Sequence, residues 1–200
     1  MEYYHNLTTE KSFLELQNLK KKIDFILIGG WAVYFYTKAL KSKDIDIVVD
    51  FDKLSILRKN YNLFKNARLN KYEAIKGEVQ IDIYLPHFSR IGIPVEDLIG
   101  NVTNLEGFKV LDKDYLLALK IFVSSQRAQT PKGMKDFIDV VSLIHFALAD
   151  LEKVKKILSK YKIAGAFKSV RDIAERTFEI QELNLNKHQF SKLRKLLLSS

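Results

Sequence analysis

The sequence contains no cysteine, which excludes disulfide bonds and zinc sites built from thiolates. It also lacks an apolar run near the roughly 20 residues that a membrane-spanning helix needs, since the longest uncharged runs are residues 25–37 and 140–149. The N-terminus has no basic start followed by an apolar segment, so no secretory signal is indicated. We therefore expect a cytoplasmic protein with no membrane partner.

The composition is that of a folded protein with a basic second half. The chain has 200 residues, of which 47% are hydrophobic and 28% charged, which is enough for one ordinary domain or two small ones. The net charge is +9. Residues 1–110 hold 16 Lys and Arg against 14 Asp and Glu, and residues 111–200 hold 17 against 10. The excess indicates either a polyanionic partner, such as nucleotide phosphates or RNA, or solvated lysine-rich helix faces.

The chain changes character near Asp112. Before it, strand-like and helix-like segments alternate, and after it almost every segment has helical periodicity. These patterns predict an α+β fold, with a sheet-containing domain at residues 1–111 followed by a C-terminal helical domain at 112–200. The predicted strands are residues 25–28, 44–49, 67–75, 78–84 and 108–111. The predicted helices are residues 9–22, 30–40, 52–64, 115–125, 135–148, 151–160, 170–182 and 187–198, with a helical turn at 94–99.

Three aspartates occur within alternating apolar strands. In Asp44-Ile45-Asp46-Ile47, the isoleucines share one face and the two aspartates share the other, about 6–7 Å apart along the strand. The segment from Val79 to Tyr84 repeats this alternation and places Asp82 on its polar face. If the two strands are neighbours, the three carboxylates lie on one face of the sheet.

Neighbouring carboxylates repel one another, so they require a cation or shared protons. Mg²⁺ is the cation that combines carboxylate ligands with phosphate oxygens, and Mn²⁺ is the alternative. Asp44, Asp46 and Asp82 are therefore candidate metal ligands, and Asp82 is also placed to accept the proton of an attacking hydroxyl. Asp50-Phe51-Asp52 serves as an internal control, because it lacks the apolar alternation and is interpreted as a strand end and a helix cap.

Gly29 and Gly30 end the first strand and begin a helix. Such glycines let the backbone approach a ligand closely, and the helix N-terminus offers free N–H groups to phosphate. The alternative is a tight strand-to-helix turn without a ligand. The spacing matches neither the dinucleotide-binding fingerprint nor the P-loop.

Together these features resemble the nucleotidyltransferase fold of the DNA polymerase beta-like superfamily. The resemblance implies a mixed β-sheet domain in which Gly29 and Gly30 contact phosphate, while Asp44, Asp46 and Asp82 form the metal-binding set. Ser42 stands where small hydroxyl residues often occur in that superfamily, and Lys43 lies beside it. These two residues are candidate nucleotide-binding residues. Where the family often has an arginine, this chain has only Lys38, Lys41 and Lys43.

The segment "LLALKIFVSSQRAQTPKGMKDFIDVVSLI" resembles a motif of the abortive-infection toxin-type nucleotidyltransferases. Lys120 shares a helix face with apolar residues, so it either reaches nucleotide phosphates or extends along the domain surface. Asp136 and Asp139 match the family's paired acidic positions, and Asp136 is the better candidate for a catalytic role. Basic residues on or beside the loop could meet a triphosphate or an RNA backbone, or be solvated: Arg127, Lys132 and Lys135.

The resemblance implies a Mg²⁺-dependent nucleotidyltransferase that moves a nucleoside monophosphate from an NTP to an acceptor hydroxyl on tRNA or other RNA, protein or a small molecule. The second resemblance adds the hypothesis of a toxin neutralised by an antitoxin protein. One alternative is a non-catalytic nucleotide- or RNA-binding module that keeps the fold. Another is a basic helical nucleic-acid binder in which the sheet is only a scaffold.

Overall fold

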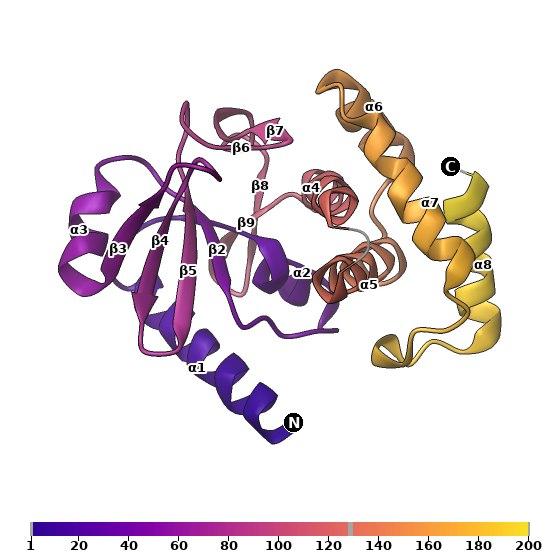
Figure 1. Cartoon of the computed structure of the whole chain (residues 1–200), viewed down its shortest axis with the longest axis horizontal. Coiled ribbons are helices and arrows are strands. Elements are labelled where there is room, and N and C mark those ends of the chain that lie inside the picture. The colour runs from indigo at the N-terminus through magenta and orange to yellow at the C-terminus, as the bar shows by residue number, and fades with distance from the viewer. Residues whose placement is uncertain (1, 128–129, 200) are drawn as a thin grey trace. The chain divides into compact units, whose positions relative to one another are not determined.

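The computed structural model describes residues 2–127 and 130–199, which form two compact units (Figure 1). The first unit runs to Phe35 and then from Lys41 to Asp112, and the second contains Tyr36–Leu40 and Lys113–Ser200. The predicted α+β architecture, with a mixed sheet followed by helices, is confirmed. Within the described ranges, no helix has the length and apolar character needed to cross a bilayer.

The first unit is built on a seven-stranded sheet in the order β3-β4-β5-β2-β1-β9-β8 (Figure 1). The two central strands, β1 and β2, are antiparallel, whereas β2 with β5 and β1 with β9 are parallel pairs. The strands are β1 Ile26–Ile28, β2 Ile45–Val48, β3 Asn62–Asn66, β4 Lys71–Lys76, β5 Val79–Tyr84, β8 Val102–Leu105 and β9 Phe108–Leu111, and a small separate ladder joins β6 Arg90–Ile91 to β7 Ile93–Pro94.

The two faces of the sheet differ because side chains alternate along each strand. One face of β2 and β5 is fully buried and carries four isoleucines: Ile45, Ile47, Ile81 and Ile83. The other face carries half-buried polar groups, including Asp46, Gln80 and Asp82. β2 and β5 are neighbours, as the convergence of the aspartates requires.

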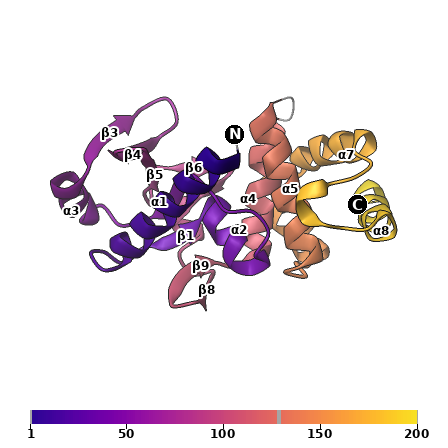
Figure 2. The ribbon, with the colours of Figure 1, turned by 90° about the horizontal axis from the view of Figure 1, so that it is seen from below.

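Helix α1 Glu2–Lys20 and the part of α2 Gly29–Thr37 that belongs to this unit pack together beside the sheet (Figure 2). Trp31 on α2 is almost fully buried, and its Nε1 donates a hydrogen bond of 2.9 Å to Oγ of Ser12 on α1. The Phe13 ring lies 5.2 Å from the Trp31 ring between centroids. The buried contact fixes α2, and hence the turn that precedes it. The unit also contains helix α3 Lys53–Asn60 and a short 3-10 turn, η1 Val95–Asp97.

The second unit is helical and follows the predicted pattern more closely. Its elements are α4 Lys113–Gln126, α5 Pro131–His145, α6 Leu151–Lys160, η2 Ala164–Ala166, α7 Phe167–Arg176, η3 Gln181–Leu183 and α8 Lys187–Ser199. Asp150 caps α6, since its Oδ1 accepts from the N–H groups of Glu152 and Lys153. At α8, the Oδ1 of Asn186 accepts from the N–H of Gln189, whose side chain bonds back to Asn186.

Several predicted elements differ from those in the structure. The helix expected over residues 52–64 ends at Asn60, because Tyr61 is extended and its hydroxyl donates to Glu15, so residues 62–66 form β3. The residues of β8 pair with β9 but were not predicted as a strand. The helix expected over residues 170–182 is α7, which begins at Phe167 and ends at Arg176.

Candidate active site

Gly29 joins β1 to α2 in a conformation that favours glycine. Its φ is +67°, in the left-handed region where a Cβ is strained. A Cβ placed there would lie 2.7 Å from the Cβ of Asp46 and closer still to its carboxylate. The Asp46 side chain therefore fills the space above this glycine. Gly30, which follows, is buried in the first turn of α2, where backbone N–H groups lack helical partners.

Asp46 and Asp82 lie in register on adjacent parallel strands, β2 and β5. Glu73 on β4 lies opposite Asp82 from the other side, so three carboxylates form one row across three strands. Asp44 is half-exposed in the bend immediately before β2. The structure therefore brings the predicted Asp46 and Asp82 together on one face, and it adds Glu73, which the sequence analysis did not single out.

A buried lysine compensates this row of carboxylates. Lys71 on β4 is only 6% exposed, and its Nζ lies 2.5 Å from Oδ2 of Asp82 and 3.0 Å from Oε1 of Glu73. Burial alone would lower the pKa of Lys71, but hydrogen bonding and attraction from Asp82 and Glu73 outweigh it and raise that pKa. The pKa of Glu73 is lowered by hydrogen bonds from Asn66 and Lys71.

The fit to a divalent cation differs between the carboxylates. Asp44 and Asp46 are oxygen donors of the kind that Mg²⁺ accepts together with phosphate oxygens. Asp82 has two protein partners, because its Oδ1 accepts from Nε2 of Gln80 at 2.9 Å and its Oδ2 contacts Lys71. Across residues 2–127 and 130–199, no three acidic or histidine side chains group closely enough to hold a metal ion.

Ser42 and Lys43 lie in the segment that leads into β2. Ser42 is buried, at 4% exposure, whereas Lys43 is exposed. Lys43 directly precedes Asp44 in the bend before β2. The nucleotide contacts of both residues remain predictions.

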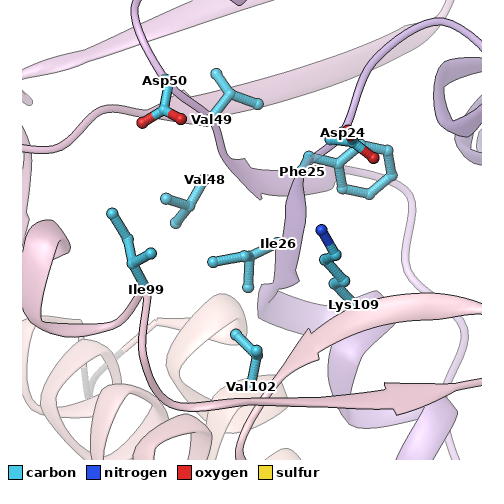
Figure 3. Close-up of a pocket in the computed structure, with 9 residues that line it drawn as sticks. All are labelled: Asp24, Phe25, Ile26, Val48, Val49, Asp50, Ile99, Val102 and Lys109. Atoms are coloured by element: carbon cyan, nitrogen blue, oxygen red, sulfur yellow. The ribbon is translucent and has the colours of Figure 1, made fainter.

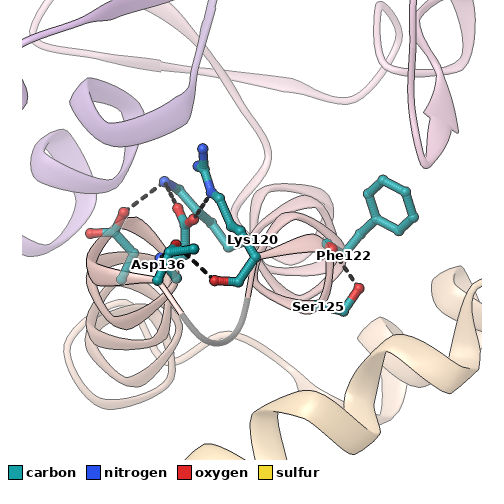
Figure 4. A network of polar contacts seen from close by, with 8 residues as sticks. Lys120, Phe122, Ser125 and Asp136 are labelled. Atoms are coloured by element: carbon teal, nitrogen blue, oxygen red, sulfur yellow. Dashed lines mark hydrogen bonds and ion pairs between the residues drawn. The ribbon is translucent and has the colours of Figure 1, made fainter. Parts of the chain in front are cut away.

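Lys120 and Asp136 belong to an ion-pair network between α4 and α5 in the helical unit (Figure 4). Lys120 Nζ lies 3.1 Å from Oδ1 of Asp136 and 2.6 Å from Oδ2 of Asp139, and Arg127 Nε donates to Oδ2 of Asp136 at 2.7 Å. Burial raises the pKa of Asp139, and the Lys120 charge opposes that rise. The Lys120 ammonium therefore already contacts two buried carboxylates. Of the other predicted basic residues, Lys132 is exposed and Lys135 is half-buried.

A cavity of about 240 Å³ lies at the start of β1 and the end of β2, which is the edge of the sheet away from Gly29 (Figure 3). It is lined by apolar side chains, among them Ile26 and Val48, with Asp24, Asp50 and Lys109 as its charged groups. Ile26 is the first residue of β1 and Val48 the last of β2, so this cavity is separate from the Gly29 turn. The control motif also lies at this end, and Asp52 precedes α3 but makes no capping hydrogen bond with its side chain.

The chain resembles solved structures despite low sequence identity. The crystal structure of ANT(2'')-Ia in complex with adenylyl-2''-tobramycin has a TM-score of 0.55 and 13% identity, covering 78% of this chain and 97% of that one. The solution structure of the antibiotic-resistance factor ANT(2'')-Ia has a TM-score of 0.53 and 14% identity, covering 86% and 95%. A proposed nucleotidyltransferase from Helicobacter pylori has a TM-score of 0.51 and 13% identity, covering 96% and 94%. No protein-family model matches the sequence, and no curated protein matches it.

Proposed function

We propose that this chain, which has the nucleotidyltransferase fold, is a nucleotidyltransferase that uses an NTP and Mg²⁺ or Mn²⁺. It would transfer a nucleoside monophosphate to an acceptor hydroxyl and release pyrophosphate. One observation carries this proposal: Asp46 and Asp82 lie in register on adjacent strands, and Asp46 packs against the left-handed Gly29 at the start of α2. Carboxylates and a helix N-terminus that adjoin in this way suit a triphosphate with its cation.

The residues of the first unit have separate roles in this reaction. Asp44 and Asp46 would hold the divalent cation, which supplies charge neutralisation to the triphosphate when bound. Backbone N–H groups at Gly29 and Gly30 would contact phosphate oxygens, and Ser42 and Lys43 would contact the nucleotide from the segment before β2.

Asp82 would accept the proton of the acceptor hydroxyl as that oxygen bonds to the α-phosphorus. The bond from the α-phosphorus to the bridging oxygen breaks, and the electron pair leaves with pyrophosphate. Asp82 thus completes the active site.

Lys120 and Asp136 remain proposed active-site residues of the helical unit, with Lys120 supplying positive charge to the phosphates. Because Lys120 already contacts two buried carboxylates, a contribution to folding is the competing explanation. Their effects on activity must therefore be compared with their effects on stability.

For the acceptor, the basic second half favours RNA, such as a tRNA end, over a protein or small molecule. The same proposal includes a biological role: the protein would act in the cytoplasm as a toxin that an antitoxin protein neutralises. The second candidate function is a non-catalytic nucleotide- or RNA-binding module, and the engagement of Asp82 by Lys71 favours it.

Labelling experiments with paired variants test the activity. The protein is incubated with α-labelled NTPs and, separately, RNA, protein extract or small hydroxyl compounds. The Asp44→Asn/Asp46→Asn variant should lose at least about a hundredfold in labelling, because a carboxylate set that acts as a unit fails when its charges are removed. The matched control is Asp50→Asn/Asp52→Asn, which removes the same charges at the other end of β2 and should label normally.

Equal labelling by the two double variants would contradict the assignment of the site. If NTP binds without any labelled product, the binding module is the better description. The class of molecule that carries the label identifies the acceptor.

A further inference from the structure

Lys71 is a buried cation that the proposed reaction does not use. Lysine is almost never this buried unless it is paired. Here its ammonium contacts two carboxylates of the row, Asp82 and Glu73, at 2.5 and 3.0 Å. The third carboxylate of the row, Asp46, lies on the other side of Asp82. The positive charge is therefore built into one end of an otherwise acidic sheet face.

The surroundings of Lys71 fix its position. Oε1 of Glu73 also accepts from Nδ2 of Asn66 at 2.9 Å, so Glu73 is itself held in place. Asp82 is fixed from two sides, by Lys71 at Oδ2 and by Gln80 at Oδ1. All of these side chains belong to strands β3, β4 and β5, which are joined by continuous ladders. The ammonium is thus placed by rigid elements rather than by a loop.

A metal ion that used Asp82 as a ligand would share a carboxylate with this ammonium. Two cations on one partly buried carboxylate repel each other strongly, and displacing Lys71 would leave an ammonium without its partners. The Lys71 ammonium contacts Asp82 and Glu73, so its competition with a metal ion concerns that end of the row.

We propose that the Lys71 ammonium takes the place of a second metal ion beside Asp82, so that this site binds a single divalent cation, at Asp44 and Asp46. The inference rests on the proposed function, since it takes those two aspartates as the cation ligands. Lys71 is then a positioning residue that acts through Asp82. It neutralises and orients a carboxylate whose remaining lone pairs face the acceptor hydroxyl.

Counting bound Mn²⁺ tests the inference without measuring activity. The full chain is saturated with an NTP analogue that resists cleavage between the α- and β-phosphates, and Mn²⁺ per chain is measured by equilibrium dialysis and electron paramagnetic resonance. The expected result is one Mn²⁺ with the spectrum of an isolated ion. Two ions in a shared site lie about 3.5–4 Å apart and couple magnetically, which would give a different spectrum.

Variants show whether Lys71 causes the difference. Lys71→Met should take up a second, coupled Mn²⁺, because Asp82 and Glu73 lose their compensating charge. Lys71→Met/Asp82→Asn should return to one ion, and Lys71→Arg should keep one. If Lys71→Met does not fold, the wild-type and Lys71→Arg counts decide the question.

The outcomes separate the two proposals. A coupled pair of ions in the wild type, or a single ion in folded Lys71→Met, would overturn the role of Lys71 and leave the proposed function standing. No bound Mn²⁺ in the wild type, with the analogue bound, would overturn the proposed function and the inference with it.

Discussion

Replacing Gly29 with alanine should destabilise the first unit through two separable effects. The left-handed backbone costs a residue with a Cβ about 1–2 kcal/mol. The new methyl group would also overlap the Asp46 side chain, with its Cβ 2.7 Å from that of Asp46. Overpacking of this kind typically costs a further ~1–3 kcal/mol. The expected loss is therefore about 2–5 kcal/mol, a large share of the ~5–15 kcal/mol that stabilises an ordinary protein.

Gly77 provides a matched control in the same sheet. It has a φ of +59° in the turn between β4 and β5, and a Cβ added there meets nothing within 4 Å. Gly77→Ala should therefore show the backbone cost alone, about 1–2 kcal/mol. The difference between the two variants measures the contact with Asp46.

Urea unfolding followed by Trp31 fluorescence measures both free energies. Trp31 is the only tryptophan, lies on α2 and is almost fully buried, so its emission reports on the first unit. In the Asp46→Gly background, Gly29→Ala should cost no more than Gly77→Ala, because the overlapping side chain is gone. Equal losses for Gly29→Ala and Gly77→Ala in the wild-type background would refute the reasoning.

Two further predictions concern buried charges. Lys120→Met should destabilise the helical unit by about 3–5 kcal/mol, because it removes the ammonium beside the buried Asp139 and leaves Asp136 with Arg127 as its remaining cation. Lys155→Met, which breaks an exposed ion pair with Glu152, should cost under about 1 kcal/mol. Urea unfolding followed by circular dichroism measures both free energies. Unchanged stability in Lys120→Met would favour a purely functional lysine. For Glu15, burial opposes ionisation, but the Tyr61 hydroxyl and the Lys76 ammonium outweigh it and lower its pKa from the usual 4.5. Its stabilisation is complete above that value and is lost as the pH falls through the lowered pKa, so Glu15→Gln should flatten the acid dependence of the unfolding free energy. An acid dependence identical to the wild type would contradict this assignment.

The central part of the site was predictable because it depends on local patterns. Period-two alternation placed Asp46 and Asp82 on polar faces, and the glycine pair marked the end of β1. The resemblance to the nucleotidyltransferase fold is confirmed by the structural comparisons. The positive φ at Gly29 and its contact with Asp46 depend on the pairing of β1 with β2, so no local sequence pattern indicated them.

The role of Lys71 was not predictable, because it depends on the register of a hairpin. The segment was interpreted as a strand over residues 67–75, but β4 begins only at Lys71, and its pairing with β5 sets Glu73 opposite Asp82. The alternation in "KYEAIK" was the available signal, since it puts Lys71 and Glu73 on one face. Similarly, helical spacing continues across the change from α3 to β3, so the pattern predicts one continuous helix there. The residues with this spacing are Leu54, Leu57, Tyr61 and Phe64. Hydrogen bonding of Tyr61 to Glu15 is a long-range contact that no local pattern reveals.

The contact between Gly29 and Asp46 limits which residues can replace either of them during evolution. As long as position 46 carries a carboxylate, position 29 admits no side chain, so the two positions are coupled by occupied volume. A descendant that lost the carboxylate would be relieved of the overlap, and only the backbone preference would still retain the glycine. Loss of the carboxylate at position 46 should therefore weaken the requirement for glycine at position 29. Among proteins of this fold with the same turn, a side chain at the position of Gly29 would then identify a member that has lost the carboxylate at the position of Asp46.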